Sequence, residues 1–311
     1  MRALLAKTAR LLALSALALS GCGLGAGRTP GAVQLVITRD FGARVLRQID
    51  APSVKGEETV MSLLMRNDAA VTTRFGGGFV QSIDGVAGGQ EAGQPVDWFY
   101  YVNGVEAGLG AAATKLHPGD HIWWDRHDWS QTEHVPAVVG SFPEPFLHGI
   151  DGQRLPVRVE CASVPGQACR TVAARLRALG VPAAIAAIGS GGAPHTLRVM
   201  VGPWLSVQGD LATENILAGP RASGVYARFA KDGRTLTLLG QDGRTTRTLL
   251  TGAGLIAATR YGEDAPVWVV TGTDAAGTDL AARALDPAVL HNHFAVALTA
   301  SESLPLPQKG P

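Results

Sequence analysis

The stretch "VDWFYYVNG", residues 96–104, constrains the fold most, because it sets four aromatic residues side by side in a chain that is only 6% aromatic. Side chains of a strand point alternately to its two faces, so burial on one face requires a large apolar residue only at every second position. The alternation predicts two sets: Trp98, Tyr100 and Val102 on one face, and Phe99, Tyr101 and Asn103 on the other. We therefore expect one face to be core and the other to be covered by protein or open to a partner.

The residues around this strand predict a small sheet crossed by one helix. Residues 33–49 alternate as a hairpin, and Thr59 is a suitable N-cap for a helix that Asn67 ends. Further short strands are predicted at 71–75, 79–83, 98–102 and 121–125. A hairpin, one helix and then more strands is the order of a β-grasp fold.

The second half of the chain predicts alternating strands and helices. Strands at 155–161, 183–189 and 195–204 and helices at 166–180 and 210–220 give the opening order of a ferredoxin-like unit. Asp-Gly pairs at 232–233 and 242–243 predict hairpins. Two more strands are expected at 254–260 and 265–272, and a mostly helical stretch at 278–298. The predicted class is α+β, a β-grasp domain followed by a ferredoxin-like α/β domain extended by β-hairpins.

The start of the chain predicts export. Arg2, Lys7 and Arg10 precede a short apolar run, and the run ends in "LSGC", which resembles the bacterial lipobox. The resemblance implies cleavage before Cys22 and a lipid anchor on its thiol; the alternative is an ordinary signal peptide. We expect a protein of the cell membrane, lipid-anchored on the extracytoplasmic face. The predicted parts are a signal peptide (1–21), a tether (22–30), a β-grasp domain (31–130), a Pro-rich linker (131–150) and an α+β domain (151–311).

Two cysteines remain after Cys22. Cys161 ends a predicted strand and Cys169 lies early in a predicted helix, so an oxidising compartment favours a disulfide between them. The alternative is that Cys169 is a small core residue.

Five motifs in order carry a family resemblance: "TVMSLL", "GGGFVQSIDG", "WFYYVNG", "GLG" and "LHPGDHIWW". Residues 31–128 resemble the transcobalamin-like C-terminal domain, a β-grasp module of cobalamin carriers and of bacterial surface proteins. The resemblance implies a corrinoid or similar bulky ligand. In the carriers a helical barrel holds the other face of the corrin, and residues 151–311 do not look like such a barrel.

We predict a recess beside the second face of the aromatic strand, bordered by residues 76–79 and 105–110. Glycines at 76–78 allow a strand to bulge or another body to approach closely. The predicted ligand-binding residues are Phe75, Gly77, Gly78, Phe79, Phe99, Tyr101 and Asn103. The alternative is that the second domain or the linker covers this face, so that all four rings belong to the core.

Other site classes have weaker support. Residues 117–129 gather histidines and aspartates, but "PGD" reads as a tight turn in which Asp120 bonds its own backbone, and we expect no metal. A formal net charge of +1 predicts no nucleic-acid partner. No G-x-S-x-G context marks a nucleophile, and we expect neither catalysis nor a cofactor.

The sequence therefore predicts a non-enzymatic binding protein, by resemblance for a corrinoid or similar cofactor that it passes to the membrane subunit of an importer. One alternative is a cell-surface protein–protein interaction module. A second alternative is an envelope hydrolase, which would need a pocket where His, Asp or Glu converge.

Overall fold

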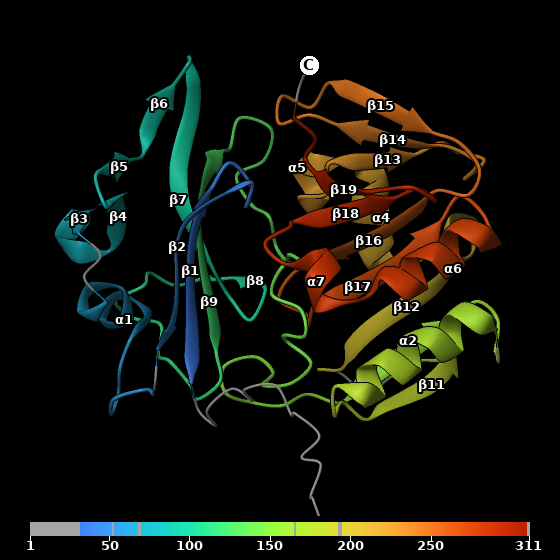
Figure 1. Ribbon diagram of the computed structural model, residues 1–311, viewed down its shortest axis with the longest axis horizontal. Coiled ribbons are helices and arrows are strands. Elements are labelled where there is room, and N and C mark those ends of the chain that lie inside the picture. Colours follow the sequence, from blue (N-terminus) through green and yellow to red (C-terminus); the bar gives the residue numbers. More distant parts are fainter. Residues whose placement is uncertain (1–31, 52, 68–69, 165, 192–194, 310–311) are drawn as a thin grey trace, which may run out of the picture.

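The computed structural model describes residues 32–51, 53–67, 70–164, 166–191 and 195–309. Cys22 and the predicted leader and tether lie outside the described residues. The protein is α+β and rich in sheet, as the sequence predicts. Figure 1 shows an N-terminal sheet beside a larger C-terminal part, with the chain after β9 running between them. Among the described residues, no helix combines the length and the apolar character that crossing a membrane requires.

The N-terminal sheet has the strand order β2-β1-β9-β7-β6, with β8 also paired to β7. Its strands are β1 (Val33–Arg39), β2 (Arg44–Ala51), β6 (Gly89–Glu91), β7 (Gln94–Val102), β8 (Val105–Glu106) and β9 (His121–Asp128). The central pair, β1 and β9, is parallel, and β2 and β7 flank it antiparallel. This is the order expected of a β-grasp sheet. A small second sheet contains β3 (Val71–Arg74), β4 (Phe79–Ile83) and β5 (Val86–Ala87), with a 3₁₀ turn, η1 (Phe75–Gly77), between β3 and β4.

Helix α1 (Val60–Arg66) covers the face of the N-terminal sheet that is turned away from the C-terminal part (Figure 1). Thr59 caps it as predicted: its side chain accepts a hydrogen bond from the Ser62 amide, and Ser62 accepts one from the Thr59 amide. The apolar side of α1 packs against Trp98 and Tyr100 in one buried cluster. Of the two faces that the alternation predicts, the one with Trp98, Tyr100 and Val102 is therefore the core face under α1.

The C-terminal sheet has seven strands in the order β11-β10-β12-β17-β16-β18-β19. They are β10 (Val157–Cys161), β11 (Ala183–Ala187), β12 (Leu197–Pro203), β16 (Gly254–Thr259), β17 (Val267–Gly272), β18 (Ala295–Leu298) and β19 (Ser303–Leu306). The first four in this order are parallel. The α+β class is therefore as predicted, but the strand directions differ from a ferredoxin-like unit. Strands β11 and β12 lie on opposite sides of β10, and each pairs parallel with it, instead of forming an antiparallel hairpin with one another.

Both faces of the C-terminal sheet are covered. Helices α2 (Gln167–Ala178) and α6 (Ala275–Ala284) pack on one face, and the other face carries α3 (Trp204–Val207), α4 (Leu211–Ala218), α5 (Pro220–Ser223) and a small antiparallel sheet. That sheet consists of β13 (Ala227–Phe229), β14 (Leu236–Leu239) and β15 (Thr245–Leu249), joined through the two predicted Asp-Gly turns.

Residues 278–298 are less helical than predicted. Helix α6 ends at Ala284, a short α7 (Pro287–Leu290) follows, and the chain then forms β18. Every residue of β18 is buried. A strand buried on both faces is as uniformly apolar as a buried helix, so its sequence did not distinguish the two.

A disulfide joins Cys161 at the end of β10 to Cys169 in α2, with 5.8 Å between their Cα atoms. The structure therefore contains the bond that the sequence predicts. It ties the last residue of a central strand to the helix that covers that strand.

The Pro-rich segment 131–150 is part of the core. Val135 and Val138 belong to the same buried cluster as Tyr101, and Phe142 and Phe146 pack against Trp268. The sequence predicted a Pro-rich linker between two domains. The structure places it between the two sheets, where its apolar side chains face both.

Candidate ligand-binding site

The second face of the aromatic strand is covered by the C-terminal part of the chain. Tyr101 is fully buried, and its ring lies 5.8 Å from that of Trp123 and 5.6 Å from that of Phe294. Phe99 stacks on His127 with the ring centres 4.5 Å apart. The alternative in which the second half of the chain covers this face is therefore correct for Tyr101.

Asn103 holds three chain segments together in the interior. Its amide nitrogen donates to Asp120 Oδ1 and to the Gly149 carbonyl, both at 2.9 Å, and its amide oxygen accepts from the His121 amide at 2.8 Å. The predicted turn is present, with φ of 52° at Asn103 and 78° at Gly104. Tyr101 and Asn103 line neither of the cavities described below. The prediction that they bind a ligand is wrong, because tertiary contacts already use both side chains.

Asp120 is buried in the turn that "PGD" predicts. Its Oδ2 accepts from the His117 amide at 2.8 Å, which is the backbone bond expected from the sequence. Burial raises the pKa of this carboxyl, and the hydrogen bonds from His117 and Asn103 act in the opposite direction.

A recess opens between the segment after β3 and the segment after β8, the two segments that the sequence predicted as its borders, but it lies on the Trp98 and Tyr100 side of the strand and not beside the second face. This aromatic recess has a volume of about 160 Å³. Its lining residues are Gly78, Phe79, Val80, Trp98, Phe99, Tyr100, Glu106, Ala107, Leu109, Gly110, Ala111 and Trp124. Three of the predicted site residues, Gly78, Phe79 and Phe99, are among them. Trp98 and Tyr100 belong both to the buried core and to the wall, since the recess opens at the edge of the α1-side core.

Hydrogen bonds fix the walls of the aromatic recess. The Trp98 indole donates to the Val86 carbonyl at 2.9 Å. The Tyr100 hydroxyl donates to the Leu109 carbonyl and shares a 2.7 Å hydrogen bond with the Thr114 hydroxyl. Burial raises the pKa of Tyr100, which keeps the phenol neutral and able to donate. The strand thus holds the 105–114 loop in place.

Two apolar side chains beside the recess are exposed to solvent. Phe75 is 87% exposed and Leu109 is 65% exposed. The Phe75 ring lies 6.5 Å from that of Phe79. Phe75 also has φ of 54°, and Gly76 and Gly77 follow with 67° and 96°. A bulky residue in the left-handed region costs of order 1–3 kcal/mol and commonly marks a functional segment. Gly77 contributes to this bend and does not line the recess.

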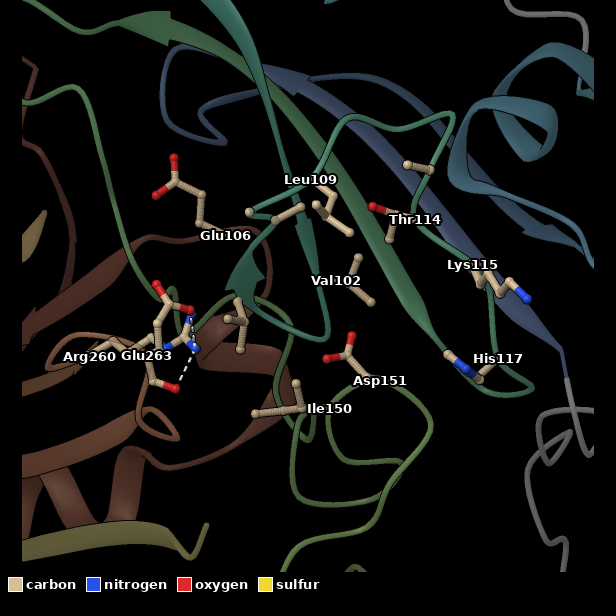
Figure 2. A pocket seen from close by; sticks show the side chains of 14 residues that line it. Val102, Glu106, Leu109, Thr114, Lys115, His117, Ile150, Asp151, Arg260 and Glu263 are labelled. Carbon is tan, nitrogen blue, oxygen red and sulfur yellow. Dashed lines mark hydrogen bonds and ion pairs between the residues drawn. The ribbon is translucent and has the colours of Figure 1, made fainter. Parts of the chain in front are cut away.

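A larger cavity of about 440 Å³ lies where the N-terminal sheet, residues 150–151 and the loop after β16 meet (Figure 2). We call it the junction cavity. Its walls combine apolar side chains such as Val102, Leu109 and Ile150 with charged ones. Glu106, Ala107 and Leu109 line both cavities. The two cavities are therefore separated by one short segment, residues 106–109.

Most charged groups of the junction cavity have partners. Lys115 pairs with Glu57 at 3.0 Å, and Arg260 pairs with Glu263 at 3.2 Å. Glu106 faces His134 at 3.5 Å, and burial raises the pKa of Glu106. Figure 2 shows the Asp151 carboxylate pointing into the space beside Val102. The cavity can therefore accept a ligand that has both apolar and hydrogen-bonding groups.

His127 of β9 has structural contacts. The predicted strand at 121–125 extends to Asp128 in the structure, so His127 lies inside β9. Its Nδ1 is 2.8 Å from Asp125 Oδ1, and Asp125 also accepts from the amides of Phe41 and Gly42. Within the described ranges, no group of three or more His, Cys, Asp or Glu side chains is arranged to hold a metal ion.

Several lining residues were not anticipated. Leu109 and Glu106 lie in the segment that the sequence predicted as a border, but no local pattern singled them out. Asp151 and Arg260 come from distant parts of the chain, and only the packing of the two sheets brings them together.

Comparison with known proteins identifies one matching family. Residues 57–128 match the family model described as a domain of unknown function, DUF4430. The match includes both segments that border the aromatic recess. No curated protein matches the chain. Among solved structures, a Ruminococcus gnavus protein described as a candidate metal-binding protein is similar, with 12% identity, a TM-score of 0.25, and coverage of 31% of this chain and 96% of that chain.

Proposed function

We propose that residues 57–128, the segment matched by this family of unknown function, are the ligand-binding part of a non-enzymatic binding protein. The observation that carries the proposal is the aromatic recess with two exposed apolar side chains beside it, Phe75 and Leu109. Exposed apolar groups around a preformed concavity are typical of binding surfaces. Phe75 has a left-handed backbone, and its ring touches Phe79 at one edge while most of its surface stays in solvent.

The ligand we propose is a corrinoid or a similarly bulky, partly flat molecule. The recess alone is too small to enclose such a ligand, so one edge would enter it while a flat face lies against Phe75 and Phe79. The junction cavity across residues 106–109 would accept polar side arms. The motif resemblance of residues 31–128 to the transcobalamin-like C-terminal domain supports this class of ligand.

We further propose that the protein acts outside the cytoplasm, anchored by lipid at Cys22, and passes its ligand to the membrane subunit of an importer. The support is the "LSGC" sequence after a basic, apolar start. The disulfide between Cys161 and Cys169 agrees with an oxidising compartment.

The test is a titration of the protein with hydroxocobalamin and cobinamide, followed by tryptophan fluorescence and by the corrinoid absorbance. Phe75→Ala should weaken binding about 2–12-fold, the range that one aromatic contact supplies. Leu250→Ala is the matched control, because Leu250 is also apolar and 67% exposed but lies outside both cavities. Unchanged affinity in the Phe75 variant would contradict the placement of the ligand against the exposed ring beside the recess.

An interaction module is the second candidate, and the exposure of Phe75 and Leu109 is the observation that favours it. Neither corrinoid would then change the fluorescence. That result would overturn the small-molecule proposal and leave these two side chains as contacts for a protein.

A further inference from the structure

Strand β11 is an edge strand without the usual protection against pairing. It is the outermost strand of the C-terminal sheet and pairs, among the described residues, with β10 alone. Its sequence is Ala183-Ala184-Ile185-Ala186-Ala187, and Ile185 at its centre is 43% exposed. An open edge presents unpaired backbone N–H and C=O groups to any extended chain.

Other edges of the molecule contain residues that discourage such pairing. Strand β2 has Arg44 and Arg47, β15 has Arg247, and β19 contains Pro305. Charged side chains and prolines are the common means of blocking edge-to-edge association. Strand β11 has neither, and no charged residue occurs anywhere from 181 to 191.

The sequence of β11 is also palindromic. Read in either direction it is Ala-Ala-Ile-Ala-Ala. Two copies that pair antiparallel about Ile185 therefore place Ile185 opposite Ile185. Alanine lies opposite alanine at all the remaining positions of the strand. A two-fold interface requires this self-complementarity, because the same patch is used on both copies.

We propose that β11 pairs antiparallel with β11 of a second copy of this chain, joining the two C-terminal sheets into one continuous sheet. The partner is a second copy because an unrelated peptide would gain nothing from the palindrome. Ile185 is next to Val159 of β10 and so lies on the α2 side of the sheet. Pairing brings the two half-exposed Ile185 side chains together there. Pro182 and Gly189 limit the ladder to five residues, which predicts a small and reversible interface.

The register is tested by cysteine cross-linking. The full chain with Cys22→Ser is the background, since Cys161 and Cys169 are already bonded to each other. In this background Ile185→Cys, Ala184→Cys and Ala186→Cys are made separately, oxidised with copper phenanthroline, and resolved without reductant. Directly opposed residues have Cα atoms about 4.5–5.5 Å apart, within disulfide range.

We expect Ile185→Cys to form about tenfold more dimer than either alanine variant alone, because position 184 lies about 8 Å from its own copy and opposite position 186. A mixture of Ala184→Cys and Ala186→Cys should cross-link as Ile185→Cys does. Equal cross-linking of all three variants would indicate random collision and overturn the proposal. The proposal would also be overturned if the mixture of Ala184→Cys and Ala186→Cys cross-linked no more than either variant does alone.

Sedimentation of proteins without an added cysteine gives the second test. The wild-type mass should rise with concentration towards that of a dimer, and Ile185→Lys should remain a monomer over the same range. Leu250→Lys, at another exposed apolar position, should associate as the wild type does. Melting temperatures report whether each variant is folded. A folded Ile185→Lys variant that still dimerises through the same range would refute pairing at β11.

Discussion

Tyr101→Ala should destabilise the protein strongly, because this ring joins the two sheets. Tyr101 is fully buried in the cluster that also contains Trp123 of the N-terminal sheet and Phe294 beside the C-terminal sheet. A buried aromatic side chain removes about 150–250 Å² from water, which at about 25 cal/mol per Å² corresponds to about 4–6 kcal/mol as an upper limit. Aromatic-to-alanine substitutions in cores cost about 3–5 kcal/mol, and we expect a loss in that range.

The assay is urea unfolding followed by circular dichroism and by tryptophan fluorescence. Tyr101→Phe is the matched control, because it keeps the ring and removes a hydroxyl that has no hydrogen-bond partner among the described residues. Its cost should be about 1 kcal/mol or less. Phe75→Ala, at a solvent-exposed ring, should change stability by no more than about 0.5 kcal/mol. A loss below about 1 kcal/mol for Tyr101→Ala would refute the shared core of the two sheets.

Three further predictions concern other parts of the chain. Replacing Cys161 and Cys169 with serine should lower stability by about 2–3 kcal/mol, and thiol counting on the unreduced protein should find no free thiol from this pair. Cys22→Ser should release the protein from membranes in detergent partitioning and change its mature mass; an unchanged distribution would contradict the proposed anchor. Burial raises the pKa of Glu106 above its ordinary value of 4.5, so the native state keeps a proton that the unfolded chain releases, and this group lowers stability as the pH rises through that window. The free energy of unfolding of Glu106→Gln should therefore exceed that of the wild type by more at pH 7 than at pH 4. Identical pH profiles of unfolding for the two proteins would contradict the burial argument.

Much of the local structure followed from the sequence. The Thr59 cap, the end of α1 at Asn67, the Asn103-Gly104 turn and the Asp-Gly hairpins depend on a few neighbouring residues, so short patterns contain the necessary information. The Asp274 cap of α6, whose side chain accepts from the Gly277 amide, is equally local.

The aromatic recess was predicted in part. Its two bordering segments were expected from the glycines at 76–78 and from the loop after Asn103-Gly104. The assignment of ligand contacts to Tyr101 and Asn103 failed, because alternation along a strand shows that two faces exist and does not show what covers the second one.

The sequence by itself determined the α+β class, the β-grasp order of the first half and the capped first helix, since each depends on periodicity, on turn chemistry or on residues close in the chain. Tertiary structure alone decided the parallel order around β10, the burial of residues 131–150 between the sheets, and the meeting of Asp151 with Arg260 at one cavity. These features join segments far apart in the chain. Their free energy comes from burying apolar surface, which is non-directional and leaves no local signature by which a sequence could name the partner.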